Sequence, residues 1–162
     1  NRLHNKKTEG VAIFHGRDLF GYCAARLASG IISFEQVGPA YPVEEIKEHT
    51  IHEPTVEGGS VKGIFEIDDP NFGNLWTNIP LKLFQEQGFK YGDRVRLRIF
   101  NKGVQVFDEK VLFHQSFGFA EENEPIIYNN ELLRIALAVS RGSFKKQYNA
   151  GFGPDWTLEF SH

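Results

Sequence analysis

The chain has 162 residues, a formal net charge of −3 and 41% hydrophobic residues, a composition typical of one globular domain or slightly more. The weak negative charge argues against a protein that binds nucleic acid, which would usually present a basic face. Cys23 is the only cysteine, which excludes a disulfide framework and a cysteine-based zinc site. No apolar run is long enough to span a membrane and no secretory signal is visible, so we expect a cytoplasmic protein.

Residues 11–36 predict the end of an α/β unit. The apolar run over 11–14 is typical of a short buried strand, and a tight connection follows it. We expect Asp18 to cap a helix over 19–29, because its carboxylate can accept from free N–H groups of the first turn, and Gly30 to end that helix. The chain begins with an asparagine and contains no methionine, so we expect a fragment or a processed chain.

The pattern changes to strands after a proline-containing stretch over 37–45, which predicts a linker. The run RVRLRIF over 94–100 alternates charged and apolar residues, and the NKG that follows predicts a hairpin turn. Pro80 and Gly88 predict the start and the end of a short helix. Further strands are expected over 64–68, 75–79 and 156–160, with a second hairpin over 124–139.

We therefore expect an α+β fold. Residues 1–36 would be the remnant of an α/β domain, with its strand, loop and helix, and residues 37–45 would be the linker. Residues 46–162 would form an antiparallel β domain, either a sandwich or a barrel.

His15 is the first candidate for chemistry. It would follow a strand of an α/β unit, at the edge where such folds bind ligands, and Gly16 beside it would let a ligand approach closely. A neutral imidazole there could hold or polarise a water molecule. The alternative is that His15 and Asp18 only begin the helix.

The loop over 67–80 is the second candidate. Phe72 can stack on a flat heterocycle, and Asn74 can pair with a donor–acceptor edge such as that of adenine. Asp68 or Asp69 could hold an ammonium group. The alternative is a hairpin turn in which these polar side chains bind the local backbone.

Two later stretches carry weaker signals. Phe117, followed by a glycine, could supply a second stacking face, although a core phenylalanine explains it as well. Gly142 could expose main-chain amides, which an ordinary turn would also do. Lys145 and Lys146 are expected to be solvated. The histidines lack metal-ligand spacing, so we expect no metal site.

The two strongest stretches together resemble one protein family. FHGRDLF over 14–20 and FGNLWTNI over 72–79 are similar to signature segments of the S-adenosyl-L-methionine (SAM) hydroxide adenosyltransferases, whose superfamily includes the fluorinase and the chlorinase. The run that ends in SRGS over 140–143 fits as well. The resemblance implies an N-terminal α/β domain, of which this chain carries the tail, and a C-terminal β domain. It also implies a homotrimer that binds a small-molecule substrate between subunits.

The resemblance assigns roles to single residues. His15 would help to position the attacking water or hydroxide, together with an aspartate and an arginine from the part of the N-terminal domain that this chain lacks. Phe72 and Phe117 would stack on adenine, and Asn74 would bond to the edge of the base.

The remaining assignments are less definite. Asp69 would meet the amino group of the methionine moiety, although the loop length leaves Asp68 open. Trp76 stands where many hydrolytic members carry an aliphatic residue and where the halogenases carry tryptophan. A looser part of the match adds three binding residues, Gly142, Ser143 and Phe144.

The implied reaction is the hydrolysis of SAM. Water or hydroxide attacks C5′ of the ribose, L-methionine leaves and adenosine forms, and neither a metal nor an organic cofactor is required. A halogenase is one rival, but the fluorinase and the chlorinase carry tyrosine at the position of His15, and a histidine suits the handling of water. A non-catalytic module that binds adenosine or SAM is the second rival.

Overall fold

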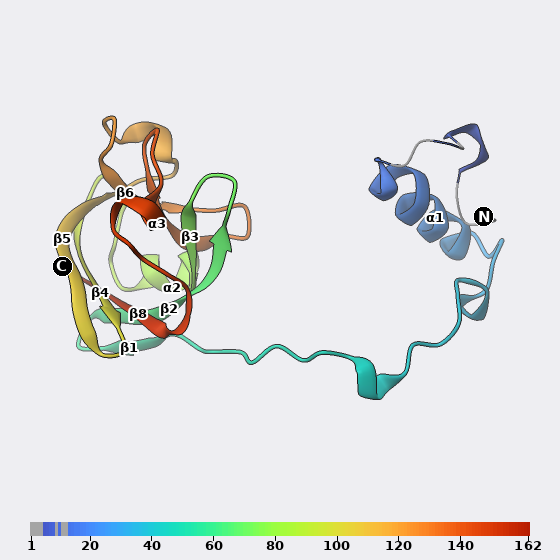
Figure 1. Ribbon diagram of the computed structural model, residues 1–162, viewed down its shortest axis with the longest axis horizontal. Coiled ribbons are helices and arrows are strands. Elements are labelled where there is room, and N and C mark those ends of the chain that lie inside the picture. The colour runs from blue at the N-terminus through green and yellow to red at the C-terminus, as the bar shows by residue number, and fades with distance from the viewer. Residues whose placement is uncertain (1–4, 9, 11–12) are drawn as a thin grey trace. The chain divides into compact units, whose positions relative to one another are not determined.

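The computed structural model describes residues 5–8, 10 and 13–162 (Figure 1). The chain divides into two compact units, Asn1–His49 and Thr50–His162, which we call the N-terminal unit and the barrel unit. No helix in the described part of the chain is both long enough and apolar enough to cross a membrane.

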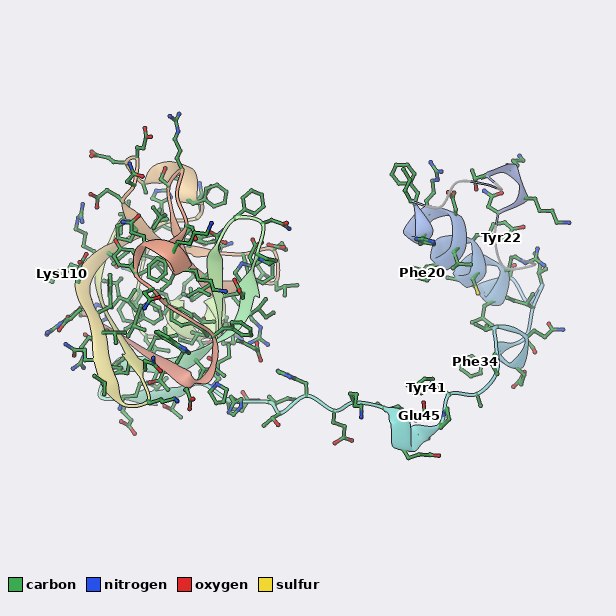
Figure 2. The ribbon with its side chains drawn as sticks, viewed as in Figure 1. Phe20, Tyr22, Phe34, Tyr41, Glu45 and Lys110 are labelled. Carbon is green, nitrogen blue, oxygen red and sulfur yellow. The ribbon has the colours of Figure 1, made fainter. Side chains whose placement is uncertain are left out.

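Short helices make up the N-terminal unit, and several of its large apolar side chains, among them Phe20 and Phe34, are exposed (Figure 2). Its elements are η1 (Lys6–Thr8), η2 (Gly16–Gly21), α1 (Tyr22–Ala28), η3 (Phe34–Gln36) and η4 (Val43–Glu45). The π-helical segment η2 continues directly into α1. The helix expected over 19–29 is therefore confirmed, although it begins earlier.

The start of this helix corrects one expectation. His15 already has helical backbone angles and lies at the N-cap, so Asp18 sits inside the helix instead of capping it. The N–H of Asp18 donates to the carbonyl of Phe14 at 2.9 Å, as in a continuous helix. Of the strand expected over 11–14, the first two residues lie outside the described part of the chain and the last two are not in a strand.

Gly30 ends the helix as predicted. Its φ of +70° is in the left-handed region, which glycine adopts without steric cost. Its N–H donates to the carbonyl of Leu27 at 3.1 Å, and the N–H of Ile31 donates to Arg26 at 2.9 Å. These two bonds satisfy carbonyl groups that the end of a helix would otherwise leave without partners.

Within residues 50–162, seven strands close into a barrel, with the order β2–β3–β7–β6–β5–β4–β8 and a final pairing of β8 with β2. The strand β1 extends β2 as a hairpin outside the ring. The bounds are β1 (Thr55–Glu57), β2 (Ser60–Asp69), β3 (Asn74–Pro80), β4 (Arg94–Asn101), β5 (Val104–Phe113), β6 (Pro125–Asn129), β7 (Arg134–Val139) and β8 (Gly153–Ser161). The helices of this unit are α2 (Leu81–Glu86), η5 (Phe117–Phe119) and α3 (Phe144–Gln147). The α+β class, the barrel and the predicted hairpins are thus confirmed.

One pairing departs from a purely antiparallel domain. Strands β5 and β6 run parallel, with Leu112 opposite Ile126, while the other pairings of the barrel are antiparallel. Parallel neighbours need a connection that crosses back to the same end of the sheet. Residues 114–124, which include η5, supply that crossing.

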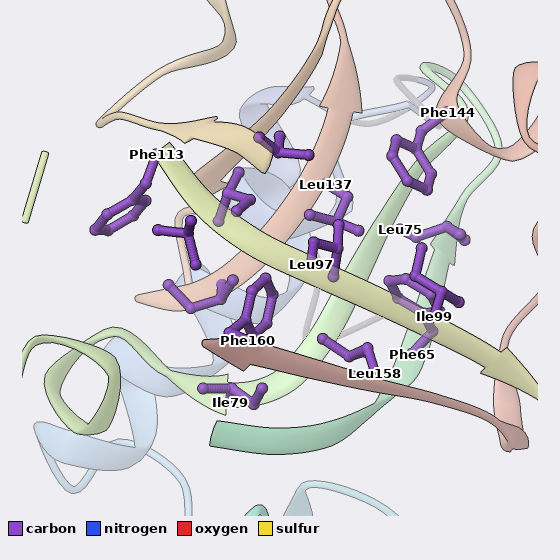
Figure 3. Packing of buried hydrophobic residues seen from close by; sticks show 14 of the residues in the cluster. Phe65, Leu75, Ile79, Leu97, Ile99, Phe113, Leu137, Phe144, Leu158 and Phe160 are labelled. Atoms are coloured by element: carbon purple, nitrogen blue, oxygen red, sulfur yellow. The ribbon is translucent and has the colours of Figure 1, made fainter. Parts of the chain in front are cut away.

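The barrel interior is filled by apolar side chains that alternate along the strands (Figure 3). In β4, Val95, Leu97 and Ile99 are buried and the intervening arginines face outward, as the sequence predicts. Arg96 and Arg98 pair there with carboxylates of the neighbouring strands.

Phenylalanines close one end of the core. The ring of Phe84, from α2, stacks on Phe89 at 4.3 Å and meets Phe113 and Phe160 edge-on, each at 4.9 Å. All four rings are buried. Of the 15 phenylalanines in the chain, seven are thus buried in the core and seven others, among them Phe72 and Phe117, are exposed.

Candidate functional site

The loop between β2 and β3 holds the first group of candidate residues. Asp69 lies opposite Asn74 at the end of the ladder. Oδ1 of Asp69 accepts the N–H of Asn71 at 3.1 Å, and its carbonyl accepts the N–H of Gly73 at 2.7 Å. These bonds define a tight turn that satisfies its own backbone. Phe72 is left near the tip with 64% of its surface exposed, so its ring is open to a ligand.

Lys145 distinguishes the two adjacent aspartates of this loop. Its Nζ forms a salt bridge with Asp68, whose side chain is only 16% exposed. Asp69 forms no salt bridge with any other residue that the structure describes. Its negative charge is therefore available for an ammonium group. The expectation that Lys145 is merely solvated is wrong, whereas Lys146 is exposed as expected.

A second, smaller apolar cluster lies on the outer face of β3, β7 and β6. Ala136 of β7 lies opposite Trp76 of β3 and opposite Tyr128 of β6, so the three side chains share one face. The small alanine leaves room between the two aromatic rings. Asn74 lies two residues before Trp76, on the same face, and its Nδ2 donates to Oη of Tyr128 at 3.3 Å.

The Tyr128 hydroxyl is the buried polar centre of this face. Burial raises the pKa of Tyr128; the nearby N–H groups of Trp76 and Asn74 act in the opposite direction, and the charge of Asp69 raises the pKa further. The hydroxyl is therefore protonated at neutral pH. The indole N–H of Trp76 is buried without a hydrogen bond of good geometry in the described part of the chain, although it lies close enough to Tyr128 to influence that pKa.

Phe117 reaches the same tyrosine from the turn η5. The hydroxyl of Ser116 accepts the N–H of Gly118 at 3.3 Å and so caps this turn. The ring of Phe117 meets Tyr128 edge-on at 5.6 Å and remains 44% exposed. Two of the residues expected to bind adenine, Asn74 and Phe117, thus meet on one side chain. A hollow of about 470 Å³ beside Phe117 extends to Ser140 and Arg141.

The turn that contains Gly142 packs against the β2–β3 loop. A Cβ on Gly73 would overlap Ser143, and the N–H of Lys145 donates to the carbonyl of Gly73 at 3.1 Å. The hydroxyl of Ser143 accepts the N–H of Lys146 at 3.2 Å and caps α3. The structure thus brings this turn to the loop that carries Phe72.

Phe144 has a structural side chain. It is fully buried and packs against Phe107 at 6.0 Å and Tyr148 at 4.7 Å. Its ring is therefore not available to a ligand. The looser match over 142–144 implies a role for main-chain amides and assigns none to this ring. Only the main chain of Phe144 remains a candidate for binding.

His15 lies in the N-terminal unit, and its side chain is exposed. In the helix that it begins, Asp18 is fully buried and accepts Nε and Nη2 of Arg17 at 2.6 and 2.8 Å. The guanidinium of Arg17 also lies over the ring of Phe14 at 4.9 Å. Phe14, Arg17 and Asp18, which lie close to His15 in the sequence, thus contact one another.

Metal ligands do not gather in the described residues: no group of three or more His, Cys, Asp or Glu side chains is placed to bind a metal ion there.

Residues 63–157 match the family model of the SAM hydroxide adenosyltransferase C-terminal domain. The chain belongs to the SAM hydroxide adenosyltransferase family. The family resemblance is thereby confirmed, and the matched residues include FGNLWTNI, η5 and the turn before α3. FHGRDLF over 14–20 lies outside the matched range.

Relatives in this family carry two kinds of name. The chain is 32% identical over 142 residues to a fluorinase of Actinoplanes sp. and 31% identical over 140 residues to the (R)-S-adenosyl-L-methionine hydrolase of Thermus thermophilus. These matches cover 86% and 85% of the chain but 46% and 45% of those proteins, so the chain spans about half the length of the curated relatives it matches. The identities are too similar to decide between the two reactions.

A solved structure has a similar fold. An uncharacterized conserved protein from Thermotoga maritima is 28% identical to the chain and aligns with a TM-score of 0.64, over 99% of the chain and 57% of that protein.

Sequence reasoning missed two residues of the site. The sequence pattern placed Tyr128 in a strand without a further role, and it predicted Lys145 to be a solvated surface charge. Both contact partners that are far away in the sequence, 54 residues for Tyr128 with Asn74 and 77 for Lys145 with Asp68. The tyrosine in an otherwise aliphatic run, PIIY, was the one local signal.

Proposed function

We propose that the protein hydrolyses SAM to adenosine and L-methionine. An oxygen of water or hydroxide forms a bond to C5′ of the ribose while the C5′–S bond breaks, the sulfur keeps the electron pair, and an attacking water gives up a proton. The sulfonium is already a good leaving group. The protein therefore has mainly to orient the nucleophile opposite the sulfur and to remove part of its hydration. This chemistry needs neither a metal nor an organic cofactor.

The barrel unit would hold the substrate. The exposed ring of Phe72 and the half-exposed ring of Phe117 would stack on adenine, and Asn74 would bond to the edge of the base. The carboxylate of Asp69 would pair with the ammonium group of the methionine moiety. The main chain around Gly142 would border the same pocket.

The observation that carries hydrolysis is the identity of residue 15. The fluorinase and the chlorinase of this superfamily have tyrosine at that position, whereas this chain has His15 followed by Gly16. An imidazole can accept a hydrogen bond from a water molecule or take its proton near neutral pH. His15 would thus position the nucleophile.

Halogenation is the second candidate, and Trp76 favours it. The halogenases of this superfamily carry tryptophan there, whereas many hydrolytic members carry an aliphatic residue. In this chain Trp76 packs against the outer-face cluster with Tyr128 and Ala136. Since it serves that packing, Trp76 weighs less in the choice than His15.

We further propose that the active protein is a cytoplasmic homotrimer in which the substrate lies between subunits. His15 belongs to the N-terminal unit and the base-binding residues belong to the barrel unit. In the proposed trimer one subunit would supply the nucleophile side of the site and its neighbour the adenine side.

Product analysis tests the choice of reaction. The protein is incubated with SAM in buffers that contain fluoride, chloride or neither, and the products are separated by chromatography with mass detection. Hydrolysis predicts adenosine and methionine in equal amounts in every buffer. A 5′-halo-5′-deoxyadenosine that replaces adenosine when halide is present would support the halogenase. Binding of SAM without any product would support the non-catalytic module.

A further inference from the structure

The side-chain amide of Asn74 is hydrogen-bonded to Tyr128. Nδ2 of Asn74 donates to Oη of Tyr128 at 3.3 Å, and the pair is nearly buried, with 5% of Asn74 and 7% of Tyr128 exposed. A primary amide is planar, so fixing its nitrogen on one branch also fixes Oδ1 on the other. No described residue donates a hydrogen bond to Oδ1 of Asn74. The oxygen is therefore the group that a bound ligand would meet.

The surroundings hold Tyr128 in place. Its partner across the strands, Ala136, is too small to displace the ring, and Phe117 packs edge-on against it at 5.6 Å. On the far side of Ala136 stands Trp76, whose indole N–H forms no hydrogen bond of good geometry with the described residues but lies close enough to Oη to lower the pKa of Tyr128. Three residues, from β3, β7 and η5, thus surround the Tyr128 side chain.

An amide oxygen that faces the ligand discriminates between purines. The exocyclic amino group of adenine at C6 donates hydrogen bonds, whereas the 6-oxo group of hypoxanthine only accepts them. Opposite Oδ1 of Asn74, an amino group would form a hydrogen bond and an oxo group would leave two acceptors facing each other. A buried polar site that loses its partner rejects such an analogue strongly.

We infer that Tyr128 is a positioning residue that turns Oδ1 of Asn74 toward the ligand and so sets a preference for 6-amino over 6-oxo purine nucleosides. This inference rests on the proposed function, because it assumes that the purine of the substrate lies against Asn74. It adds a residue that the sequence motifs did not indicate and a chemical basis for the choice of base.

Calorimetric titration with adenosine and with inosine tests the inference. Four proteins are compared: the wild type, Tyr128→Phe, Asn74→Ala and the double variant. Wild type should prefer adenosine, and Tyr128→Phe should reduce the ratio of the two affinities by about tenfold, the scale of one lost hydrogen bond to a polar partner. In the Asn74→Ala background, Tyr128→Phe should change the ratio no further, because the two residues act through one contact.

Tyr91→Phe is the matched control. Its hydroxyl also bonds to an asparagine side chain, although here it donates, to Oδ1 of Asn129 at 2.8 Å, so a tyrosine–asparagine hydrogen bond is removed at another place. This variant should keep the wild-type ratio. A thermal unfolding curve for each variant establishes that it is folded, and the ratio of two ligands on one preparation is insensitive to a partly inactive sample.

The outcomes separate the inference from the proposed function. If the wild type binds neither nucleoside, both fail. If the wild type binds adenosine and Tyr128→Phe keeps the full preference, Tyr128 does not position the amide and the inference alone fails. The same holds if Tyr128→Phe still alters the ratio in the absence of the Asn74 side chain.

Discussion

Lys145 and Asp68 form a salt bridge that joins α3 to the end of β2, across 77 residues of sequence. The bridge neutralises one of two adjacent carboxylates and leaves that of Asp69 without a cation among the described residues. The bridge thus gives Asp68 a structural partner and leaves Asp69 as the candidate for binding an ammonium group.

The first prediction compares these two aspartates. Asp69→Asn should raise the KM for SAM by about tenfold or more, because a charge-assisted contact to the ammonium group is lost, and should leave the unfolding midpoint nearly unchanged. Asp68→Asn should instead lower the free energy of unfolding by about 1 kcal/mol or less, since Lys145 is partly exposed and solvent screens the pair. Steady-state kinetics and denaturant unfolding of both variants provide the measurement. A larger KM effect for Asp68→Asn would reverse the assignment.

The second prediction concerns the contact between Gly73 and Ser143. Gly73 has a φ of +70°, and a Cβ there would overlap the Ser143 side chain. Gly73→Ala should therefore destabilise the protein and weaken adenosine binding, because the loop that carries Phe72 must move. Gly92→Ala is the matched control, since Gly92 also has a positive φ, +99°, but open space around it.

Only the backbone strain of about 1 kcal/mol should appear in Gly92→Ala. Adding Ser143→Gly to Gly73→Ala should restore part of the lost affinity, because it removes the overlapping side chain. Equal stability losses in the two alanine variants, with no rescue by Ser143→Gly, would show that the contact does not hold the loop.

The third prediction is a loss of stability at alkaline pH. Burial raises the pKa of Tyr128 above that of an unfolded tyrosine, which is about 10. The folded protein therefore retains a proton that the unfolded chain releases. The stabilisation is complete below about pH 10 and is lost as the pH rises through the folded pKa. Burial raises the pKa values of Tyr91 and Tyr148 in the same direction.

The free energy of unfolding, measured by denaturant titration from neutral pH to above pH 10, should fall less steeply in Tyr128→Phe than in the wild type. Tyrosine absorbance recorded in the same samples reports the ionisation directly. Parallel pH profiles for the two proteins would mean that the Tyr128 hydroxyl is as accessible to solvent when folded as when unfolded.

Local features of the fold were predictable from the sequence. The alternation in β4, the left-handed turn at Gly103 and the helix stop at Gly30 depend on residues within a few positions of one another. The parallel pairing of β5 with β6 was not predictable, because it depends on how the barrel closes. No period within either strand encodes that choice.

The candidate site likewise contains residues that the local sequence predicts and residues that it does not. Phe72 and Asn74 stand in one motif and could be identified from it, and the motif also contains the turn that exposes the ring. The position of Asp18 inside the helix was missed, because an aspartate near a helix start usually caps it and here the helix begins at His15. Tyr128 and Lys145 contact partners that are distant in the sequence, so the local pattern around each did not indicate a place in the site.

The fourth prediction concerns His15. His15→Ala should slow adenosine formation from SAM by about 10²–10⁴-fold, the usual contribution of a group that positions or deprotonates a nucleophile. The affinity for adenosine should change little, because the base-binding residues belong to the barrel unit. Single-turnover kinetics and calorimetry measure the two quantities. His15→Gln, which keeps a hydrogen-bonding side chain, should lose less activity than His15→Ala. An undiminished rate in both variants would leave His15 as a residue of the helix start.

The origin of the oxygen in the product tests the central claim most directly. SAM is incubated with the protein in water enriched in ¹⁸O, and adenosine and methionine are examined by mass spectrometry. Attack of water or hydroxide at C5′ predicts adenosine that carries the label in its 5′ hydroxyl and methionine that carries none. Unlabelled adenosine, labelled methionine or a 5′-halogenated nucleoside as the main product would contradict hydrolysis at C5′.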